Sequence, residues 1–229
     1  MKIAIMGAMR EEIEPLLNLL SNYTEVEYGK NIYYEAKYKD LDLVIAYSKI
    51  GKVFSTMTAT TMIEKFGAKK LIFTGVAGGI NPKLKIGDLI VAKKLCQHDV
   101  DITSFGHPFG FIPESKIYVQ SDKELIDLAK IVAKEIGKPL LEGTIATGDQ
   151  FVADSKKKEW IQKEFNADAI EMEGASVAVV CDSLNIPFLI IRAISDVADM
   201  DASFSFDEFL RSSANESAKF IFKFLERLS

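Results

Sequence analysis

Phe188-Leu189-Ile190-Ile191 is a run of four large apolar residues with no polar residue between them. Neighbouring residues of a β-strand point to opposite faces, so a strand with this sequence is expected to be buried on both sides. Strands of this kind belong to sheets that helices cover on both faces. The run therefore predicts an α/β fold.

Segments of strand length alternate with segments of helical period on either side of this run. The pattern predicts strands at 2–8, 43–48, 70–74, 88–92, 144–147, 169–172 and 188–194, and helices at 11–20, 55–66, 121–136, 156–165, 175–184 and 206–228. Two helices are expected to start at the capping boxes Ser121-x-x-Glu124 and Ser205-x-x-Glu208. The two β-rich segments between 70 and 92 connect without a helix, so the sheet is predicted to be mostly parallel but mixed. No linker or repeat interrupts residues 1–229, which predicts a single domain.

The composition narrows the class of partner. The net charge is −5 and the basic residues are dispersed, whereas a nucleic-acid-binding protein usually carries a basic stripe. Cys96 and Cys181 each lie in an apolar run, which predicts two buried thiols and a reducing compartment. The apolar N-terminal segment is short and predicts a first strand rather than a signal peptide, and no stretch has the length of a membrane span. We expect a cytoplasmic protein with no nucleic-acid or membrane partner.

Acidic residues and glycines follow several of the predicted strands. The segments are Gly7-Ala8-Met9-Arg10-Glu11-Glu12, Thr74-Gly75-Val76-Ala77-Gly78-Gly79, Gly148-Asp149-Gln150-Phe151, Glu171-Met172-Glu173-Gly174 and Ser195-Asp196. Ligands of open α/β sheets bind beyond the carboxyl ends of the strands, so Glu12, Glu173 and Asp196 are predicted to meet at one edge. Each has an ordinary alternative. Glu12 could complement a helix dipole, Glu173 could lie on a solvated edge strand, and Asp196 could cap a turn.

Several kinds of site are excluded by the motifs. The chain has no phosphate-binding Gly-x-x-x-x-Gly-Lys-Ser/Thr loop and no Gly-x-Gly-x-x-Gly after the first strand. Its only histidines are His98 and His107, which excludes a His-rich metal site. The stretch His98-Asp99-Val100-Asp101 could bind a cation, although loop solvation or a substrate contact fits it better. We predict no metal and no cofactor.

Taken together, the motifs resemble those of 5′-methylthioadenosine/S-adenosylhomocysteine nucleosidases, members of the nucleoside phosphorylase superfamily. The matching segments are Gly7-Ala8-Met9-x-Glu11-Glu12, Ser48-x-Ile50-Gly51-Lys52, Thr74–Gly79, Gly148-Asp149-x-Phe151, Glu171-Met172-Glu173, Arg192-Ala193-Ile194-Ser195-Asp196-Val197-Ala198 and Ser205-Phe206-Asp207-Glu208-Phe209. They span essentially the whole chain, in order. The resemblance implies a mixed sheet that curls towards a barrel, flanked by helices, and a homodimer.

The resemblance also implies a role for each site residue. Glu12 would activate the attacking water, Asp196, oriented by Ser195, would protonate purine N7, and Glu173 would bind the ribose hydroxyls. The other implied substrate contacts are Gly78, Met172 and Arg192 near the sugar, Phe151 and Val152 at the adenine, and Met9, Ile50 and Phe206 around the alkylthio group. Ile102, Phe105, His107 and Pro113 would reach in from the partner subunit.

The implied reaction, hydrolysis of an N-glycosidic bond, requires these residue types. Adenine leaves poorly as an anion, so an acid whose pKa is raised by burial is needed beside its ring nitrogen. The sugar develops oxocarbenium character, which carboxylates stabilise, and the water needs a base. For Glu12 the helix dipole lowers the pKa while nearby carboxylates raise it, and the sequence leaves that balance open.

Three alternatives accompany this reading. A phosphorylase on the same fold would release ribose 1-phosphate, but Val76 replaces a serine common in relatives, and together with Glu11 and Glu12 it disfavours an anion site. A non-catalytic nucleoside-binding module would not need three convergent carboxylates. Within the hydrolase reading, the substrates would be 5′-methylthioadenosine, S-adenosylhomocysteine and 5′-deoxyadenosine. Tolerance for 6-amino-6-deoxyfutalosine would depend on the loop Phe105–Pro113.

Overall fold

The computed structural model of the protein describes residues 1–197 and 202–229, with side chains described up to 197 and from 209 onward. The strands in these ranges are β1 (Lys2–Gly7), β2 (Tyr23–Tyr28), β3 (Asn31–Tyr38), β4 (Leu41–Tyr47), β5 (Lys70–Phe73), β6 (Val76–Gly79), β7 (Leu89–Gln97), β8 (Val119–Gln120), β9 (Leu140–Thr147), β10 (Ala169–Glu171) and β11 (Phe188–Val197). The helices are α1 (Arg10–Leu19), α2 (Lys52–Glu64), the short 3-10 helix η1 (Thr103–Phe105), α3 (Lys123–Glu135), α4 (Ser155–Phe165), α5 (Gly174–Ser183) and α6 (Ala202–Leu228).

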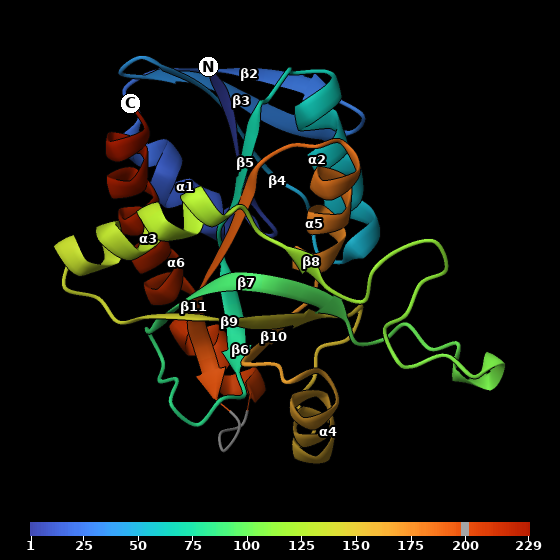
Figure 1. Ribbon diagram of the computed structural model, residues 1–229. Helices are drawn as coiled ribbons and strands as arrows, with labels where there is room; N and C mark the ends of the chain where they lie inside the picture. Colours follow the sequence, from blue (N-terminus) through green and yellow to red (C-terminus); the bar gives the residue numbers. More distant parts are fainter. Residues whose placement is uncertain (198–201) are drawn as a thin grey trace.

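All these strands join one mixed sheet in the order β2-β3-β4-β1-β5-β11-β6-β10-β9-β7-β8 (Figure 1). The long strand β11 connects its two halves, because residues 188–190 pair with β5 while its second half pairs with both β6 and β7. The β11–β7 pairing closes β11, β6, β10, β9 and β7 into a ring. The expected mixed α/β sheet that curls towards a barrel is confirmed.

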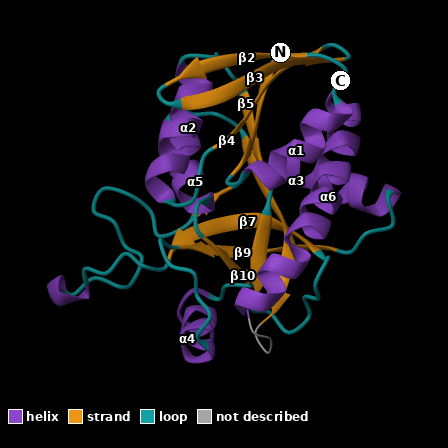
Figure 2. Ribbon diagram, turned by 180° about the vertical axis from the view of Figure 1, so that it is seen from behind, coloured by secondary structure: helices purple, strands orange, loops and turns teal. Residues whose placement is uncertain are grey.

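Two apolar cores lie on opposite faces of the sheet, as the run in β11 predicts. Phe188 and Ile190 belong to the core that α2 and α5 cover, whereas Leu189 and Ile191 belong to the core under α1, α3 and α6. Figure 2 shows these two groups of helices on either side of the strands. Burying a side chain of this size stabilises the fold by roughly 1.5–3 kcal/mol. The two cores therefore hold the strand ends in fixed positions.

The structure adds strands that were not expected. β2 and β3 form an antiparallel hairpin joined by Gly29 and Lys30, both at positive φ (58° and 60°). A two-residue hairpin turn needs that conformation at both positions, and Lys seldom adopts it, so the sequence signal is weak. The glycine-rich segment expected to be only a turn contains β6, which pairs with β10 and β11.

Two of the expected helix starts were wrong. The N-cap of α3 is Asp122, whose Oδ1 accepts a 2.9 Å hydrogen bond from the Leu125 amide, and the buried Ser121 hydroxyl has no hydrogen-bond partner among the described residues. Helix α6 begins at Ala202, so Ser205 lies inside the helix rather than at its start. In α3 the residue next to the predicted cap satisfies the helix end.

Both cysteines are free and buried, as predicted. No helix among residues 1–197 and 202–229 combines the length and the apolar character needed to cross a bilayer.

Candidate active site

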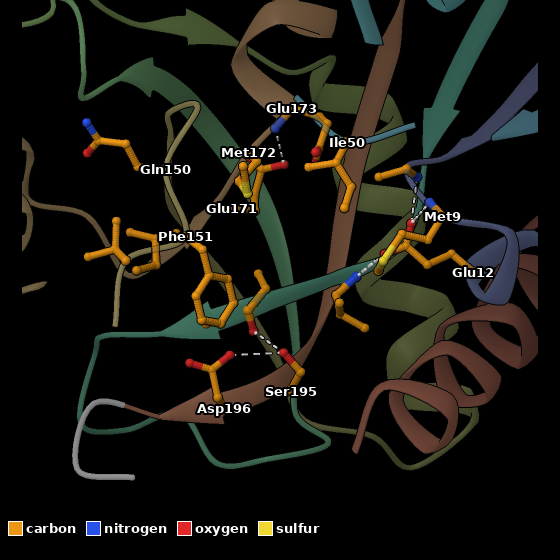
Figure 3. Close-up of a pocket in the computed structure, with 16 residues that line it drawn as sticks. Met9, Glu12, Ile50, Gln150, Phe151, Glu171, Met172, Glu173, Ser195 and Asp196 are labelled. Atoms are coloured by element: carbon orange, nitrogen blue, oxygen red, sulfur yellow. Dashed lines mark hydrogen bonds between the residues drawn. The ribbon is translucent and has the colours of Figure 1, made fainter. Parts of the chain in front are cut away.

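Segments that follow β1, β4, β9 and β10 meet strands β6 and β11 around one cavity of about 310 Å³ (Figure 3). Its lining residues are Ala8, Met9, Glu12, Ile50, Val76, Ala77, Gly78, Gln150, Phe151, Val152, Ile170, Glu171, Met172, Glu173, Ser195 and Asp196. The structure therefore brings Glu12, Glu173 and Asp196 together, although they lie far apart in the sequence. A cavity of this size suits a small organic molecule such as a nucleoside.

Glu12 is held in the cavity by three backbone amides. It is the third residue of α1, and its carboxylate turns back over the helix start. Oε2 accepts hydrogen bonds from the amides of Ala8 (2.6 Å) and Met9 (3.0 Å), and Oε1 accepts one from Val76 (2.9 Å). A Cβ at Gly75 would collide with this carboxylate, so the glycine allows its approach. Glu12 therefore has one fixed orientation, and the backbone of Val76 contributes to it.

Burial has the largest effect on the pKa of Glu12. Its side chain is buried, and this desolvation raises its pKa above the usual value of 4.5. The positive charge of Arg192 and the three amide hydrogen bonds act in the opposite direction but are outweighed. The balance that the sequence left open falls on the side of a raised pKa, which suits a residue that accepts a proton near neutral pH.

Glu171 and Glu173 lie two residues apart but have different surroundings. The carboxylate of Glu171 accepts hydrogen bonds from the Thr147 hydroxyl, from the Gly174 amide (2.7 Å) and from Arg192 (2.8 Å). These hydrogen bonds tie β9, α5 and β11 together. Glu171 touches the cavity, but its carboxylate is already engaged with the protein.

Glu173 is the member of the pair that is free to bind a ligand through most of its carboxylate. It accepts one hydrogen bond, 2.8 Å from the Gly51 amide to Oε1. Burial, and next the charge of Glu171, raise its pKa to about 8, against the Gly51 hydrogen bond and Arg192, which lower it. A carboxyl group with this pKa can both donate and accept hydrogen bonds near neutral pH, as sugar hydroxyls require.

A bulge in β11 places Asp196. The register between β11 and β6 shifts between Ile194 and Asp196, so the consecutive residues Ser195 and Asp196 both line the cavity. The Ser195 hydroxyl donates a 3.1 Å hydrogen bond to Oδ1 of Asp196. A Cβ at Gly78 would lie 3.0 Å from Oδ2, so the glycine leaves room for the carboxylate. The strand irregularity thus directs an acid into the cavity.

Asp196 is also an acid whose pKa is raised. Burial raises the pKa above 3.8, while the Lys158 ammonium and the Ser195 hydroxyl lower it by a smaller amount. Lys158 Nζ lies 3.5 Å from Oδ2. Sequence reasoning missed this lysine, because Lys156-Lys157-Lys158 has the pattern of a solvated helix surface. In the structure Lys156 is exposed and Lys158 is 2% exposed.

Some residues predicted for the site lie elsewhere. Arg192 is not among the residues that line the cavity, because it is buried behind Glu171 and also donates a 3.1 Å hydrogen bond to the carbonyl oxygen of Phe73. The side chain of Phe206 lies outside the described residues. The residues predicted to reach in from a partner subunit are Ile102, Phe105, His107 and Pro113. They do not line this chain's own cavity, and the loop that carries them projects away from the fold (Figures 1 and 2).

Several lining residues were not singled out from the sequence. Gln150 lay inside a quoted motif without a role of its own, Glu171 was grouped with Glu173, and Val76 was noted only as the replacement of a serine. The structure shows that the backbone amide of Val76 donates a hydrogen bond to Glu12. Within the described part of the chain, no cluster of three His, Cys, Asp or Glu residues could hold a metal ion.

The cavity has two chemically different ends (Figure 3). At one end the Phe151 ring stands near Asp196 and Ser195, which suits a flat heteroaromatic ring that accepts a proton at its edge. At the other end lie Glu12, Met9 and Ile50, and Glu173 and Met172 lie along the wall between the two ends. This arrangement of an aromatic surface, an acid and further carboxylates along one cavity suits a nucleoside that lies along its length.

Comparison with known proteins agrees with this geometry. The profile of the Phosphorylase superfamily matches residues 2–226. The chain is 58% identical over 228 residues to an aminodeoxyfutalosine nucleosidase of Campylobacter jejuni, with 100% of both chains covered. It is 38% identical over 229 residues to a 5′-methylthioadenosine/S-adenosylhomocysteine nucleosidase of Haemophilus influenzae, again with 100% of both covered.

A solved structure gives the same result. A futalosine hydrolase mutant of Helicobacter pylori superposes with a TM-score of 0.97 at 50% identity, covering 99% of each chain. Fold, cavity and sequence therefore agree, and the chain belongs to the phosphorylase superfamily, in its nucleosidase branch.

Proposed function

We propose that the protein hydrolyses the N-glycosidic bond of adenine nucleosides that carry a substituent at the 5′ carbon, releasing adenine and the 5-substituted ribose. One observation carries the proposal: Glu12, Glu173 and Asp196 are buried around a single cavity, and the pKa of each is raised. Three such groups cost stability, because burying a carboxyl group without full pairing is unfavourable. Acid–base work on a bound substrate explains why they are there.

On the base side, Asp196 is the general acid. In the proposed pose adenine lies against Phe151, with the backbone of Val152 at its amino edge and N7 towards Asp196. As the C1′–N9 bond breaks, its electron pair moves into the purine, and the Asp196 proton moves to N7. Ser195 supports this step by fixing the orientation of the Asp196 carboxyl group.

On the sugar side, Glu173 binds the ribose hydroxyls, with Met172 beside them, and Gly78 leaves space at the strand surface. Negative charge on Glu12 stabilises the oxocarbenium character that develops at C1′, while Glu173, whose pKa of about 8 keeps it largely protonated near neutral pH, acts through its hydrogen bonds to the hydroxyls. Glu12 takes a proton from the attacking water, and its three amide donors keep it aimed at one place. General acid and base groups in such positions contribute about 10²–10⁴-fold each.

The nucleophile in this proposal is water rather than phosphate. None of the described residues that line the cavity is Lys or Arg, and three of them are acidic residues with raised pKa values. A phosphate dianion would meet unfavourable charge there and would find no paired cation. Val76 in place of a serine removes a further donor from the same wall.

As substrates we propose 5′-methylthioadenosine, S-adenosylhomocysteine, 5′-deoxyadenosine and 6-amino-6-deoxyfutalosine, with Met9 and Ile50 around the 5′ substituent. One relative is named for aminodeoxyfutalosine and the other for the two thionucleosides, and the chain is more similar to the first. These substrates place the protein in methionine salvage and menaquinone biosynthesis. Two free buried thiols suit the reducing cytoplasm as its location.

A homodimer that completes the cavity belongs to the same proposal. Val53, Phe54 and Met57 in the first turns of α2 are exposed although apolar, and so is Ile50, two residues before the helix begins. Ile50 also lines the cavity, so this apolar face of α2 continues into the cavity mouth. Phe105, at the tip of the projecting loop, is 81% exposed. An apolar surface of this kind marks an interaction site.

The test is adenine release from 5′-methylthioadenosine in phosphate-free buffer, repeated with phosphate. We expect equal release in both, with free 5-methylthioribose as the second product. Release only with phosphate, together with a sugar 1-phosphate, would identify a phosphorylase. Binding without release under either condition would support a nucleoside-binding module. Parallel assays with 6-amino-6-deoxyfutalosine and S-adenosylhomocysteine then rank the 5′ groups by kcat/KM.

A further inference from the structure

Lys158 is a buried cation beside the proposed acid. It lies on α4, below the half of the sheet that contains β9 and β10 (Figure 1), and is 2% exposed. Its ammonium nitrogen is 3.5 Å from Oδ2 of Asp196 and has no hydrogen-bond partner within the described ranges 1–197 and 202–229. Removing an ammonium group from water costs several kcal/mol unless its charge is compensated. An apolar side chain would fill this buried position without that cost.

The charges around Asp196 make the position of Lys158 informative. Ser195, on the same strand, supplies a neutral hydroxyl, and the other ionisable residues that line the cavity are Glu12, Glu171 and Glu173. Lys158 is thus the cation that the structure pairs with Asp196, whereas Arg192 is paired with Glu171. The acid end and the sugar end of the cavity each have their own buried counter-charge.

We propose that Lys158 is a positioning residue that sets the acid strength of Asp196, by stabilising the carboxylate that remains after the proton has moved to the leaving base. The inference rests on the proposed function. In the reaction the C1′–N9 electron pair goes to the purine, the Asp196 proton goes to N7, and the new Asp196 anion lies beside the Lys158 ammonium. The water that adds to C1′ gives its proton to Glu12, and exchange with solvent returns both acids to their starting forms.

Two opposing effects act on Asp196 in this arrangement. Burial raises its pKa, which keeps it protonated before the reaction, and the Lys158 charge lowers its pKa, which makes it a stronger acid. Without Lys158 the acid would hold its proton to higher pH but would release it less readily. These two consequences have opposite signs in a pH–rate profile, so they can be distinguished from general damage.

The principal variant is Lys158→Met, which keeps the length of the side chain and removes the charge. We expect kcat for 5′-methylthioadenosine to fall about tenfold, KM to change little, and the alkaline limb of the pH–rate profile to move up by roughly one pH unit. Lys158→Arg should keep most of the activity. The matched control is Lys156→Met, the same change on the exposed surface of the same helix. It should leave kcat, KM and the pH–rate profile unchanged.

A double-mutant cycle with Asp196→Asn tests whether the effect passes through Asp196. Because the amide has no proton to give, Lys158→Met should have no further effect on kcat in that background. An unchanged pH profile in Lys158→Met, or a fall of the same size with and without Asp196→Asn, would overturn the proposal.

A measurement that needs no turnover distinguishes this inference from the proposed function. Carbon-13 NMR titration of labelled aspartate, assigned through Asp196→Asn, should show a higher Asp196 pKa in Lys158→Met than in the wild type. Equal pKa values would overturn the role of Lys158 even if adenine is released. A higher pKa in a protein that releases no adenine would leave the electrostatic role intact and reject the proposed reaction.

Discussion

Two glutamates of one short segment have acquired opposite properties from their neighbours. The carboxylate of Glu171 accepts hydrogen bonds from Thr147, Gly174 and Arg192, so its orientation is fixed by the protein. Glu173 faces the cavity with one amide donor and the Glu171 charge behind it, which raises its pKa to about 8. The charge of Glu171, held in place by its hydrogen bonds, therefore contributes to the raised pKa of the glutamate that faces the cavity.

This raised pKa makes stability depend on pH. Between the unfolded value of 4.5 and about 8, the folded protein keeps a proton on Glu173 that the unfolded chain has lost. The free energy of unfolding therefore falls as pH rises through this window, and the contribution of Glu173 is fully present only below 4.5. In Glu173→Gln the total decrease in the free energy of unfolding between pH 5 and 8 should be smaller than in the wild type by on the order of a few kcal/mol. Urea unfolding at a series of pH values measures it.

Glu159→Gln provides the control for that measurement. Glu159 is exposed on α4, and Lys163 lowers its pKa, so it titrates below the window and its loss should leave the slope between pH 5 and 8 unchanged. Parallel slopes for the wild type and Glu173→Gln would contradict the raised pKa of Glu173. Because Glu12 and Asp196 also have raised pKa values, some slope should remain in the variant.

At the scale of the elements, the sequence predicted most helices and strands but not how their ends are held. The apolar runs of β1 and β11 and the period of α1 are local patterns, and they predicted these elements well. The start of α3 depends on which of two neighbouring polar residues faces the Leu125 amide, and that choice is made by the chain entering from β8. The bulge at Ser195 depends on pairing with β6, a strand more than a hundred residues away.

The start of α3 gives a stability prediction. Asp122→Ala removes the side chain that caps the Leu125 amide and should lower the free energy of unfolding by about 1 kcal/mol. Ser121→Ala removes a buried hydroxyl that has no hydrogen-bond partner in the part of the chain that the structure describes, and it should be neutral or slightly stabilising. Thermal or urea unfolding of the two variants compares them directly. A larger loss for Ser121→Ala than for Asp122→Ala would support the capping box predicted from the sequence.

At the scale of the molecule, the site depends on the closure of the sheet. β11 pairs with β5 at its start and with β7 and β6 further along, so one strand carries the chain from the open sheet into the ring and places Asp196 one residue before its end. The order of motifs along the chain predicted which residues meet. It could not give the cavity volume, which depends on how the segments around β6 and β11 pack, or the burial of Lys158, which depends on how α4 packs against the sheet.

The exposed apolar face of α2 makes the proposed homodimer testable with one matched pair of variants. Met57 is 53% exposed on α2, and Ile131 is 52% exposed on α3, away from that face. Met57→Glu places a charge in the proposed interface, where desolvation without a partner costs several kcal/mol. We expect it to shift the protein to monomers in sedimentation experiments and to raise KM, since the partner's loop would no longer complete the cavity. Ile131→Glu should leave mass and KM unchanged. A dimer that persists in Met57→Glu, or a monomeric wild type with full activity, would show that this face and the projecting loop serve another purpose.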